Sequence, residues 1–222
     1  MLNKHVIITA GGKGKRMGSG IPKQFMELDG LPVILHTIKT FFDYSKNISF
    51  ILVLPDDGMD EWSRITEQYP LDIEYQVCHG GETRFDSVKN GLEMINEDGL
   101  VAIHDAVRPL VSTSLIKECF DLASRKGNAV PALPLADSVR EISGEESRPV
   151  DRDKFRIVQT PQVFEVSLIK KAYQQAYRDS FTDDASVLES FGSKIYLLDG
   201  EKRNIKITTP DDMMTAVAFL KE

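Results

Sequence analysis

Short apolar runs alternate with longer amphipathic runs along this chain, and the alternation limits the folds that the chain can adopt. Residues 6–10, 50–54 and 100–103 are mainly apolar, as is typical of strands that are buried on both faces. Residues 32–42 between them carry large apolar side chains at helical spacing. Strands that alternate with helices indicate an α/β fold with a mostly parallel sheet. Further strands are expected at 73–77, 129–133 and 195–198, and further helices at 59–69, 83–95, 113–125, 166–178, 183–191 and from 209 onward.

The alternation stops between about residues 135 and 155. Residues 138–142 alternate in polarity as a strand does, residues 143–147 form a polar turn, and residues 148–152 lead back. This pattern predicts a protruding hairpin arm. The 222 residues otherwise fit a single domain that spans 1–222. Because a hairpin has little core of its own, we expect a second subunit to cover it, as in a homodimer.

Charge and cysteine content exclude several classes of protein. The net charge is −7, whereas a non-specific nucleic-acid binder usually has a basic surface. Neither Cys78 nor Cys119 belongs to a CxxC pair, so both are expected to be buried, reduced thiols. The first residues lead directly into the first strand, and no run approaches 18 continuous apolar residues. We therefore expect a cytoplasmic protein with no membrane and no nucleic-acid partner.

The segment 10–24, which follows the first strand, is rich in glycine and in positive charge. It holds five glycines between Gly11 and Gly20, and its charged residues are Lys13, Lys15, Arg16 and Lys23. Glycines allow the backbone to approach a ligand closely and to direct its N–H groups inward. A loop of this composition suits a polyphosphate. A solvated surface loop is the alternative.

Two common phosphate-binding loops do not fit this segment. A Walker A loop requires Ser or Thr after Gly-Lys, but Arg16 follows Gly14-Lys15. A dinucleotide-binding fingerprint that starts at Gly12 would have Met17 at its third small position. The segment therefore belongs to neither of these two classes of phosphate-binding loop.

Charged groups also follow the strand expected at 100–103. Asp105 follows the expected strand directly, at the position where α/β folds bind their ligands. A single Asp can hold Mg²⁺ when phosphates and water supply the other ligands. Arg108 could bind a second phosphate, or it could form a purely structural pair with Asp105. We assign His104 a packing role, because attack by an ionised phosphate needs no general base.

The segment 80–87 combines two glycines with hydroxyl and guanidinium donors. Thr83 and Asp86 have the spacing of a capping box at a helix start, and the segment suits a base edge or a ribose. Later segments that add charge and hydroxyl groups are 151–152, 182–184 and 204–208. Considered alone, the segment 80–87 fits a bare helix start equally well, and each of the later segments is more often an ordinary surface feature than a site.

Taken in order, these segments resemble the small cytidylyltransferase family of the non-mevalonate isoprenoid pathway. The resemblance covers about residues 5 to 220. The segments that carry it are 10–17, 22–24, 80–88, 104–109, 159–162, 182–186 and 204–208.

The resemblance implies a Rossmann-like sheet with helices on both faces, a hairpin arm that builds a homodimer, and Mg²⁺-dependent transfer of CMP from CTP to 2-C-methyl-D-erythritol 4-phosphate. It implies catalytic roles for Arg16, Lys23 and Lys206, and metal binding by Asp105. The residues that it implies around CTP are Ala10, Gly11, Gly12, Lys13, Gly81, Glu82, Arg84, Ser87 and Asp105. Those implied around the acceptor are Arg108, Ser138, Arg152, Thr160, Thr182 and Lys206, of which the two arm residues could act across the dimer.

Two positions depart from the family pattern, and other assignments stay open. Ser138 stands where Thr is common, so a methyl group is missing, and Glu82 stands where Asp is common, which changes its reach. Ribitol-5-phosphate cytidylyltransferase shares the glycine loop and the segment 104–108. A nicotinamide oxidoreductase and a non-catalytic nucleotide-binding protein are the alternatives from other classes.

Overall fold

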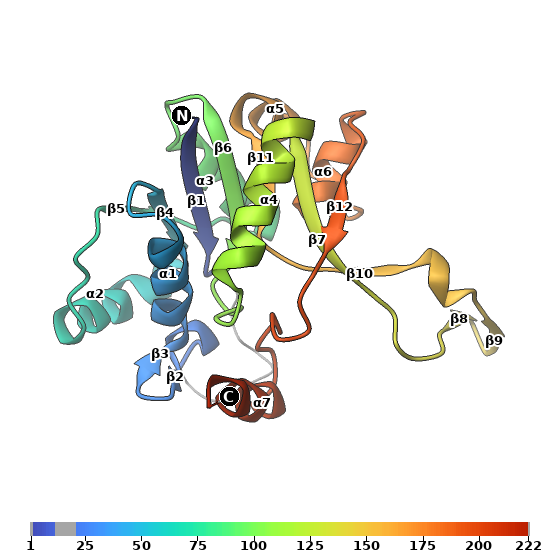
Figure 1. The fold of residues 1–222 in the computed structure, drawn as a ribbon, viewed down its shortest axis with the longest axis horizontal. Coiled ribbons are helices and arrows are strands. Elements are labelled where there is room, and N and C mark those ends of the chain that lie inside the picture. The colour runs from blue at the N-terminus through green and yellow to red at the C-terminus, as the bar shows by residue number, and fades with distance from the viewer. Residues whose placement is uncertain (1, 12–20, 222) are drawn as a thin grey trace.

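A single large sheet forms the centre of the computed structural model, which describes residues 2–11 and 21–221 (Figure 1). In this part of the chain the sheet has eight strands in the order β10-β7-β11-β6-β1-β4-β5, and β12 also pairs with β7. β1 (Asn3–Thr9) pairs in parallel with β4 (Ser49–Leu54) and with β6 (Gly99–Asp105). β5 (Tyr75–His79) pairs in parallel with β4. These strands confirm the predicted mostly parallel sheet.

The apolar run in β1 is explained by helices that cover both faces of the sheet. Val6, Ile7 and Ile8 are fully buried. Because successive side chains of a strand point to opposite faces, Val6 and Ile8 pack into one hydrophobic cluster and Ile7 into another.

Helices α1, α2 and α4 contribute to the first cluster, and α3, α5 and α6 contribute to the second. The prediction of helices on both faces is therefore confirmed. α7 packs with β2 in a smaller cluster that includes Val107. No helix in the described part of the chain has the length and apolar character needed to cross a membrane. The bounds are α1 Val33–Tyr44, α2 Met59–Gln68, α3 Arg84–Glu93, α4 Thr113–Lys126, α5 Val166–Ala172, α6 Asp184–Ser190 and α7 Pro210–Leu220.

The other half of the sheet contains antiparallel strands. β11 (Gln162–Glu165), which was not expected from the sequence, lies between β6 and β7 (Asn128–Pro134) and runs antiparallel to both. β10 (Arg156–Val158) is antiparallel to β7, and β12 (Leu197–Asp199) is parallel to it. β10 and β11 carry the chain back from the arm, so they run opposite to the strand that led into it.

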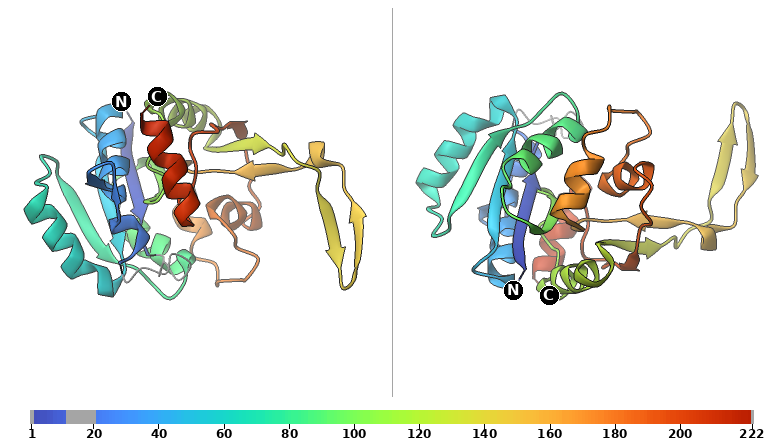
Figure 2. Two further views of the ribbon diagram at one scale, coloured as in Figure 1. Left: turned by 90° about the horizontal axis from the view of Figure 1, so that it is seen from below. Right: turned by 90° about the horizontal axis from the view of Figure 1, so that it is seen from above.

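A two-stranded hairpin projects from the body of the molecule (Figures 1 and 2). It consists of β8 (Arg140–Ser143) and β9 (Glu146–Pro149), and the turn between them includes Gly144 at a φ of 60°. Every residue of both strands is exposed. The hairpin therefore has no core within this chain.

Several element boundaries differ from those expected. The helix expected over 166–178 ends at Ala172. The next residue, Tyr173, is buried and stacks on Phe85 with ring centroids 4.7 Å apart. The strand expected at 73–77 lies at Tyr75–His79. The remaining short elements are β2 Glu27–Leu28, β3 Leu31–Pro32, and single 3₁₀ turns at Lys23–Phe25, Asp56–Gly58 and Arg152–Lys154.

Both cysteines are free thiols in the structure. Cys119 is buried, and burial raises its pKa far above the usual range. Cys78 is half-buried, and burial also raises the pKa of its thiol. The expectation of buried thiols is therefore confirmed for Cys119, whereas Cys78 is only partly buried.

Candidate active site

A pocket of about 270 Å³ lies where the carboxyl ends of β1 and β6 meet the start of α3. This is the edge at which parallel α/β sheets bind their ligands. The residues that line it are Thr9, Ala10, Gly11, Lys23, Gln24, Gly81, Glu82, Thr83, Arg84, Ser87, Asp105, Val107 and Lys206. A larger hollow of about 760 Å³ lies along the edge of β4 and β5, but none of the predicted site residues lines it.

The start of α3 forms one wall of the pocket. Thr83 and Asp86 make the predicted capping box, in which each side chain accepts from the backbone N–H of the other residue. This cap fixes the first turn of the helix, which carries Arg84 and Ser87. The spacing of Thr83 and Asp86 therefore predicted the helix start correctly. The first turn of this helix places two predicted site residues, Arg84 and Ser87, in the pocket.

Gly81 is required by the close packing of this wall. A Cβ atom at Gly81 would lie 2.2 Å from the Cβ of Asp86, so a larger residue cannot be accommodated without a shift. The backbone N–H of Gly81 donates to the Ser87 hydroxyl over 3.0 Å. The opposite wall is held by Gln24, whose side-chain amide donates to the carbonyl of Ala10 over 2.7 Å.

Asp105, at the end of β6, is the centre of charge in the pocket. The Nζ of Lys206 lies 2.9 Å from its carboxylate, the Nε of Arg108 lies 3.4 Å away, and the Nε of Arg84 lies 3.8 Å away. Burial by itself would raise the pKa of the Asp105 carboxyl, but these cations lower it far below its usual range. Asp105 is therefore a carboxylate near pH 7.

A hydrogen-bond network joins Asp105 to two distant segments. The backbone N–H of Asp105 donates to the hydroxyl of Thr160 over 3.1 Å, and Asn204 donates to the Thr160 carbonyl over 2.8 Å. The carbonyl of Asn204 accepts from Arg108 over 2.8 Å. Lys206 lies two residues after Asn204. The network therefore fixes the loop segment 204–206, which carries Lys206 to the pocket.

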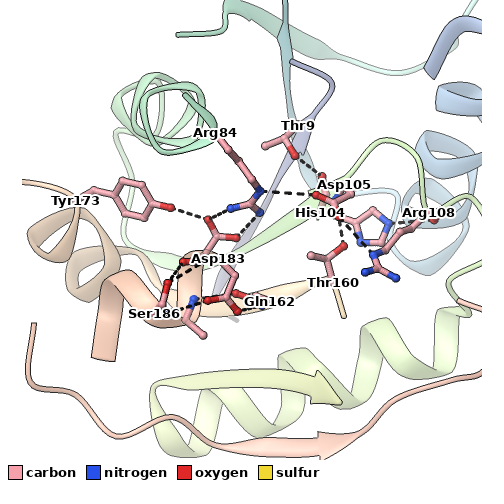
Figure 3. Close-up of polar contacts among 12 residues, drawn as sticks. Thr9, Arg84, His104, Asp105, Arg108, Thr160, Gln162, Tyr173, Asp183 and Ser186 are labelled. Carbon is pink, nitrogen blue, oxygen red and sulfur yellow. Dashed lines mark hydrogen bonds and ion pairs between the residues drawn. The ribbon is translucent and has the colours of Figure 1, made fainter. Parts of the chain in front are cut away.

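The guanidinium of Arg84 forms a two-pronged ion pair with Asp184, the first residue of α6. The two distances are 2.8 Å and 2.6 Å, and the Asp184 carboxylate also accepts from the Tyr173 hydroxyl over 2.6 Å. Figure 3 shows Arg84 and Tyr173 pointing toward one another. The sequence identified the segment 182–184 as a source of charge. No local pattern pairs this segment with Arg84, and the sequence did not indicate the contact of Tyr173 with Asp184.

His104 is fully buried beside this cluster, as the packing assignment requires. Its Nε2 donates to the carbonyl of Arg108 over 3.1 Å, and its ring meets Phe41 edge to face at 5.1 Å between centroids. Burial lowers the pKa of His104 to about 4. The imidazole is thus neutral near pH 7 and supports the turn that carries Arg108.

Some predicted residues are not part of this pocket. Thr182 is exposed just before α6, and Ser138 and Arg152 are exposed in or beside the arm. Arg152 donates to the carbonyl of Ala136. Gly12, Lys13 and Arg16 lie outside the residues that the structure describes.

A magnesium ion fits the chemistry of the Asp105 carboxylate. The group is ionised, lines the pocket, and offers the hard oxygen ligand that Mg²⁺ prefers. Among the described residues, no group of three or more His, Cys, Asp and Glu side chains could hold a metal ion without help from a ligand. The phosphates of a nucleotide and water would supply the other oxygen ligands, as is common for Mg²⁺.

The pocket combines two glycines, Gly11 and Gly81, with a carboxylate and several cations at the carboxyl edge of a Rossmann-like sheet. These groups suit a nucleotide whose phosphates carry the reacting centre, and together with the fold they define a nucleotidyltransferase. The chain belongs to the 2-C-methyl-D-erythritol 4-phosphate cytidylyltransferase family, whose model matches residues 4–222. Family membership makes it a cytidylyltransferase and confirms the resemblance found in the sequence.

Similar proteins support this assignment along the whole chain. A 2-C-methyl-D-erythritol 4-phosphate cytidylyltransferase from Phocaeicola vulgatus is 46% identical over 99% of this chain and 100% of the relative. The crystal structure of a 4-diphosphocytidyl-2C-methyl-D-erythritol synthase from Anaerococcus prevotii is 30% identical, with a TM-score of 0.84 over 100% of this chain and 97% of that chain. A 2-C-methyl-D-erythritol 4-phosphate cytidylyltransferase from Thermus thermophilus is also 30% identical, with a TM-score of 0.80 over both full chains.

Proposed function

We propose that this protein transfers CMP from CTP to 2-C-methyl-D-erythritol 4-phosphate and releases pyrophosphate, with Mg²⁺ as cofactor. The observation that carries the proposal is the cluster of Arg84, Arg108 and Lys206 around the buried carboxylate of Asp105. The product is 4-diphosphocytidyl-2-C-methyl-D-erythritol, an intermediate in the formation of isoprenoid precursors.

The nucleotide would occupy the pocket between Ala10–Gly11 and the start of α3. Ala10 and Gly11, with Gly12 and Lys13 beyond the described residues, would contact the triphosphate. Gly81, Glu82 and Ser87 would border the cytosine and the ribose; all three line the pocket. Glu82 is exposed and longer than the Asp common in the family, so its carboxylate can reach further into the base site.

The reaction we propose is an in-line displacement at the α-phosphorus. A phosphate oxygen of the acceptor forms a bond to this phosphorus, and the bond to the oxygen that bridges the α- and β-phosphates breaks. The electron pair of that bond leaves with pyrophosphate. Lys23 and Lys206, both of which line the pocket, would stabilise the charge that develops on the phosphoryl oxygens, together with Arg16.

Bound Mg²⁺ would neutralise phosphate charge and orient the triphosphate. Asp105 would hold the ion. Lys206 is the partner of Asp105 best suited to move onto a phosphate, because its side chain is 41% exposed whereas that of Arg108 is 11% exposed.

The acceptor would bind on the side of Arg108 and Thr160, with Thr182 at its border. Ser138 and Arg152 would reach the acceptor from the arm of a second subunit. Support for this homodimer comes from large apolar side chains that are exposed on the arm and on β10, namely Ile142, Phe155, Ile157 and Val158. Exposed apolar side chains of this size, beside a hairpin without its own core, favour a partner that covers them. We place the dimer in the cytoplasm.

Ribitol 5-phosphate is the alternative acceptor, and the relatives described above do not favour it. The experiment that decides is to mix the protein with CTP, Mg²⁺ and one of the two sugar phosphates and to measure pyrophosphate release. We expect faster release with 2-C-methyl-D-erythritol 4-phosphate. Faster turnover of ribitol 5-phosphate would overturn the choice of acceptor while leaving the nucleotide chemistry in place.

A further inference from the structure

One buried ionic group beside the pocket has no role in the reaction described above. Asp184 is completely buried, and a buried carboxylate is unfavourable unless it is paired and hydrogen-bonded. Its partners are Arg84, from a helix on the same face of the sheet, and Tyr173. Since Arg84 lines the nucleotide pocket, the pairing of Asp184 bears directly on that pocket.

The geometry divides the guanidinium of Arg84 between two carboxylates. Its Nη1 and Nη2 donate to Asp184 over 2.8 Å and 2.6 Å, whereas its Nε lies 3.8 Å from Asp105. The two terminal nitrogens thus form the forked pair that binds a carboxylate most strongly. Asp105 is left with the weaker and longer contact.

The position of Asp184 is fixed from two sides. On the side of the sheet, Gln162 of β11 donates to the Asp183 carboxylate over 2.8 Å and accepts from the backbone N–H of Ala185 over 2.9 Å. On the side of the helices, Tyr173 donates to Asp184 and stacks on Phe85, the neighbour of Arg84. Figure 3 shows how Gln162, Asp183 and Tyr173 converge on the start of α6.

We propose that Asp184, supported by Tyr173, is a positioning residue that holds Arg84 against the nucleotide pocket and keeps it from pairing fully with Asp105. If the charge of Asp184 were removed, Asp105 would be the nearest carboxylate to the guanidinium, at 3.8 Å. A forked pair with Arg84 would then occupy both oxygens of Asp105. Lys206 would lose its partner, and the carboxylate would be unavailable to any other cation. This inference rests on the proposed function, because it takes the pocket to be the CTP site.

The test compares three variants with the wild-type chain. Asp184→Asn keeps the shape and removes the charge, and Tyr173→Phe removes one hydroxyl while the ring stays packed. Gln175→Ala is the matched control: it removes a hydrogen bond to the Val187 carbonyl of the same helix, 3.1 Å long, without touching Arg84. The readouts are the dissociation constant of CTP by calorimetry without any acceptor, the KM for CTP, the Tm, and the position of Arg84 in a crystal structure of Asp184→Asn without ligand.

We expect Asp184→Asn to weaken CTP binding by at least about tenfold, and Tyr173→Phe to weaken it by about threefold. The KM for CTP should rise in the same order. In the crystal structure, the terminal nitrogens of Arg84 should lie within hydrogen-bond distance of Asp105. Gln175→Ala should lower the Tm but bind CTP with the affinity of the wild type. If α6 had only a structural role, any variant that destabilises it would weaken CTP binding as well.

The inference is overturned if Arg84 keeps its place in Asp184→Asn, or if Gln175→Ala weakens CTP binding as much as Asp184→Asn does. If Asp184→Asn does not fold, unchanged CTP affinity in Tyr173→Phe overturns it. A different result would refute the proposed function. If the wild-type chain binds CTP but releases no pyrophosphate with 2-C-methyl-D-erythritol 4-phosphate, that function is wrong, whereas the comparison of CTP binding among the variants remains valid.

Discussion

Replacing Asp105 with Asn removes a carboxylate that three cations share, and its effect on stability follows from the geometry. Loss of one partner of a buried ion pair destabilises a protein by about 3–5 kcal/mol. The Lys206 side chain is 41% exposed and contributes little, and Arg84 keeps Asp184 as a partner. Arg108, 11% exposed, is the cation left without a counter-charge. Because it still donates to the Asn204 carbonyl, we expect the lower end of that range, about 3 kcal/mol.

Urea unfolding, followed by circular dichroism and extrapolated to water, measures this loss. Asp121→Asn is the matched control, because it breaks an exposed pair with Lys117 in which the Asp121 side chain is 52% exposed. Such surface pairs contribute at most about 1 kcal/mol. If Asp105→Asn loses no more stability than the control, the cations are not held by Asp105 and the electrostatic account of the pocket is wrong. In active protein, the same variant should require more Mg²⁺, and an unchanged Mg²⁺ titration would count against metal binding at Asp105.

Three further predictions concern charge, pH and assembly. Lys23→Ala should lower kcat by about a hundredfold or more with an unchanged circular dichroism spectrum, because charge in the transition state loses a partner; near-normal kcat would refute that role. The pKa of His104 is about 4 in the fold against 6.5 when unfolded, so the unfolded chain binds more protons between these pH values. The free energy of unfolding should therefore fall by about 3 kcal/mol as the pH falls from 7 to 4, and His104→Gln should remove most of that fall in urea titrations at both pH values. Ile157→Asp should convert the proposed homodimer to a monomer in analytical ultracentrifugation, and a monomeric wild-type protein would contradict the proposed role of the arm.

The architecture could be predicted to the extent that it depends on local pattern. The apolar run of β1 predicted a strand covered on both faces, and the Thr83–Asp86 spacing predicted the start of α3. Local pattern could not predict that β11 lies between β6 and β7 or that it runs antiparallel to both. Its pairing depends on how the chain returns from the arm. The early end of α5 at Ala172 was likewise not predictable from a local signal, since no glycine or proline occurs between residues 173 and 180.

The pocket was predictable where chemistry follows directly after a strand. Gly11, Gly81 and Asp105 each follow or end a parallel strand, and a parallel sheet brings those ends to one edge. The pair of Arg84 with Asp184 joins residues 100 positions apart, and no local pattern specifies such a partner. The proposed roles of the arm residues Ser138 and Arg152 require a second subunit, so these roles stay predictions.

The central claim is that the acceptor phosphate attacks the α-phosphorus of CTP. Phosphorus NMR of a reaction with 2-C-methyl-D-erythritol 4-phosphate, labelled with ¹⁸O in its phosphate, tests it most directly. We predict a new diphosphate product in which the bridging oxygen carries the label, together with unlabelled pyrophosphate. A label found in pyrophosphate, or the absence of a diphosphate product while CTP is consumed, would contradict the account.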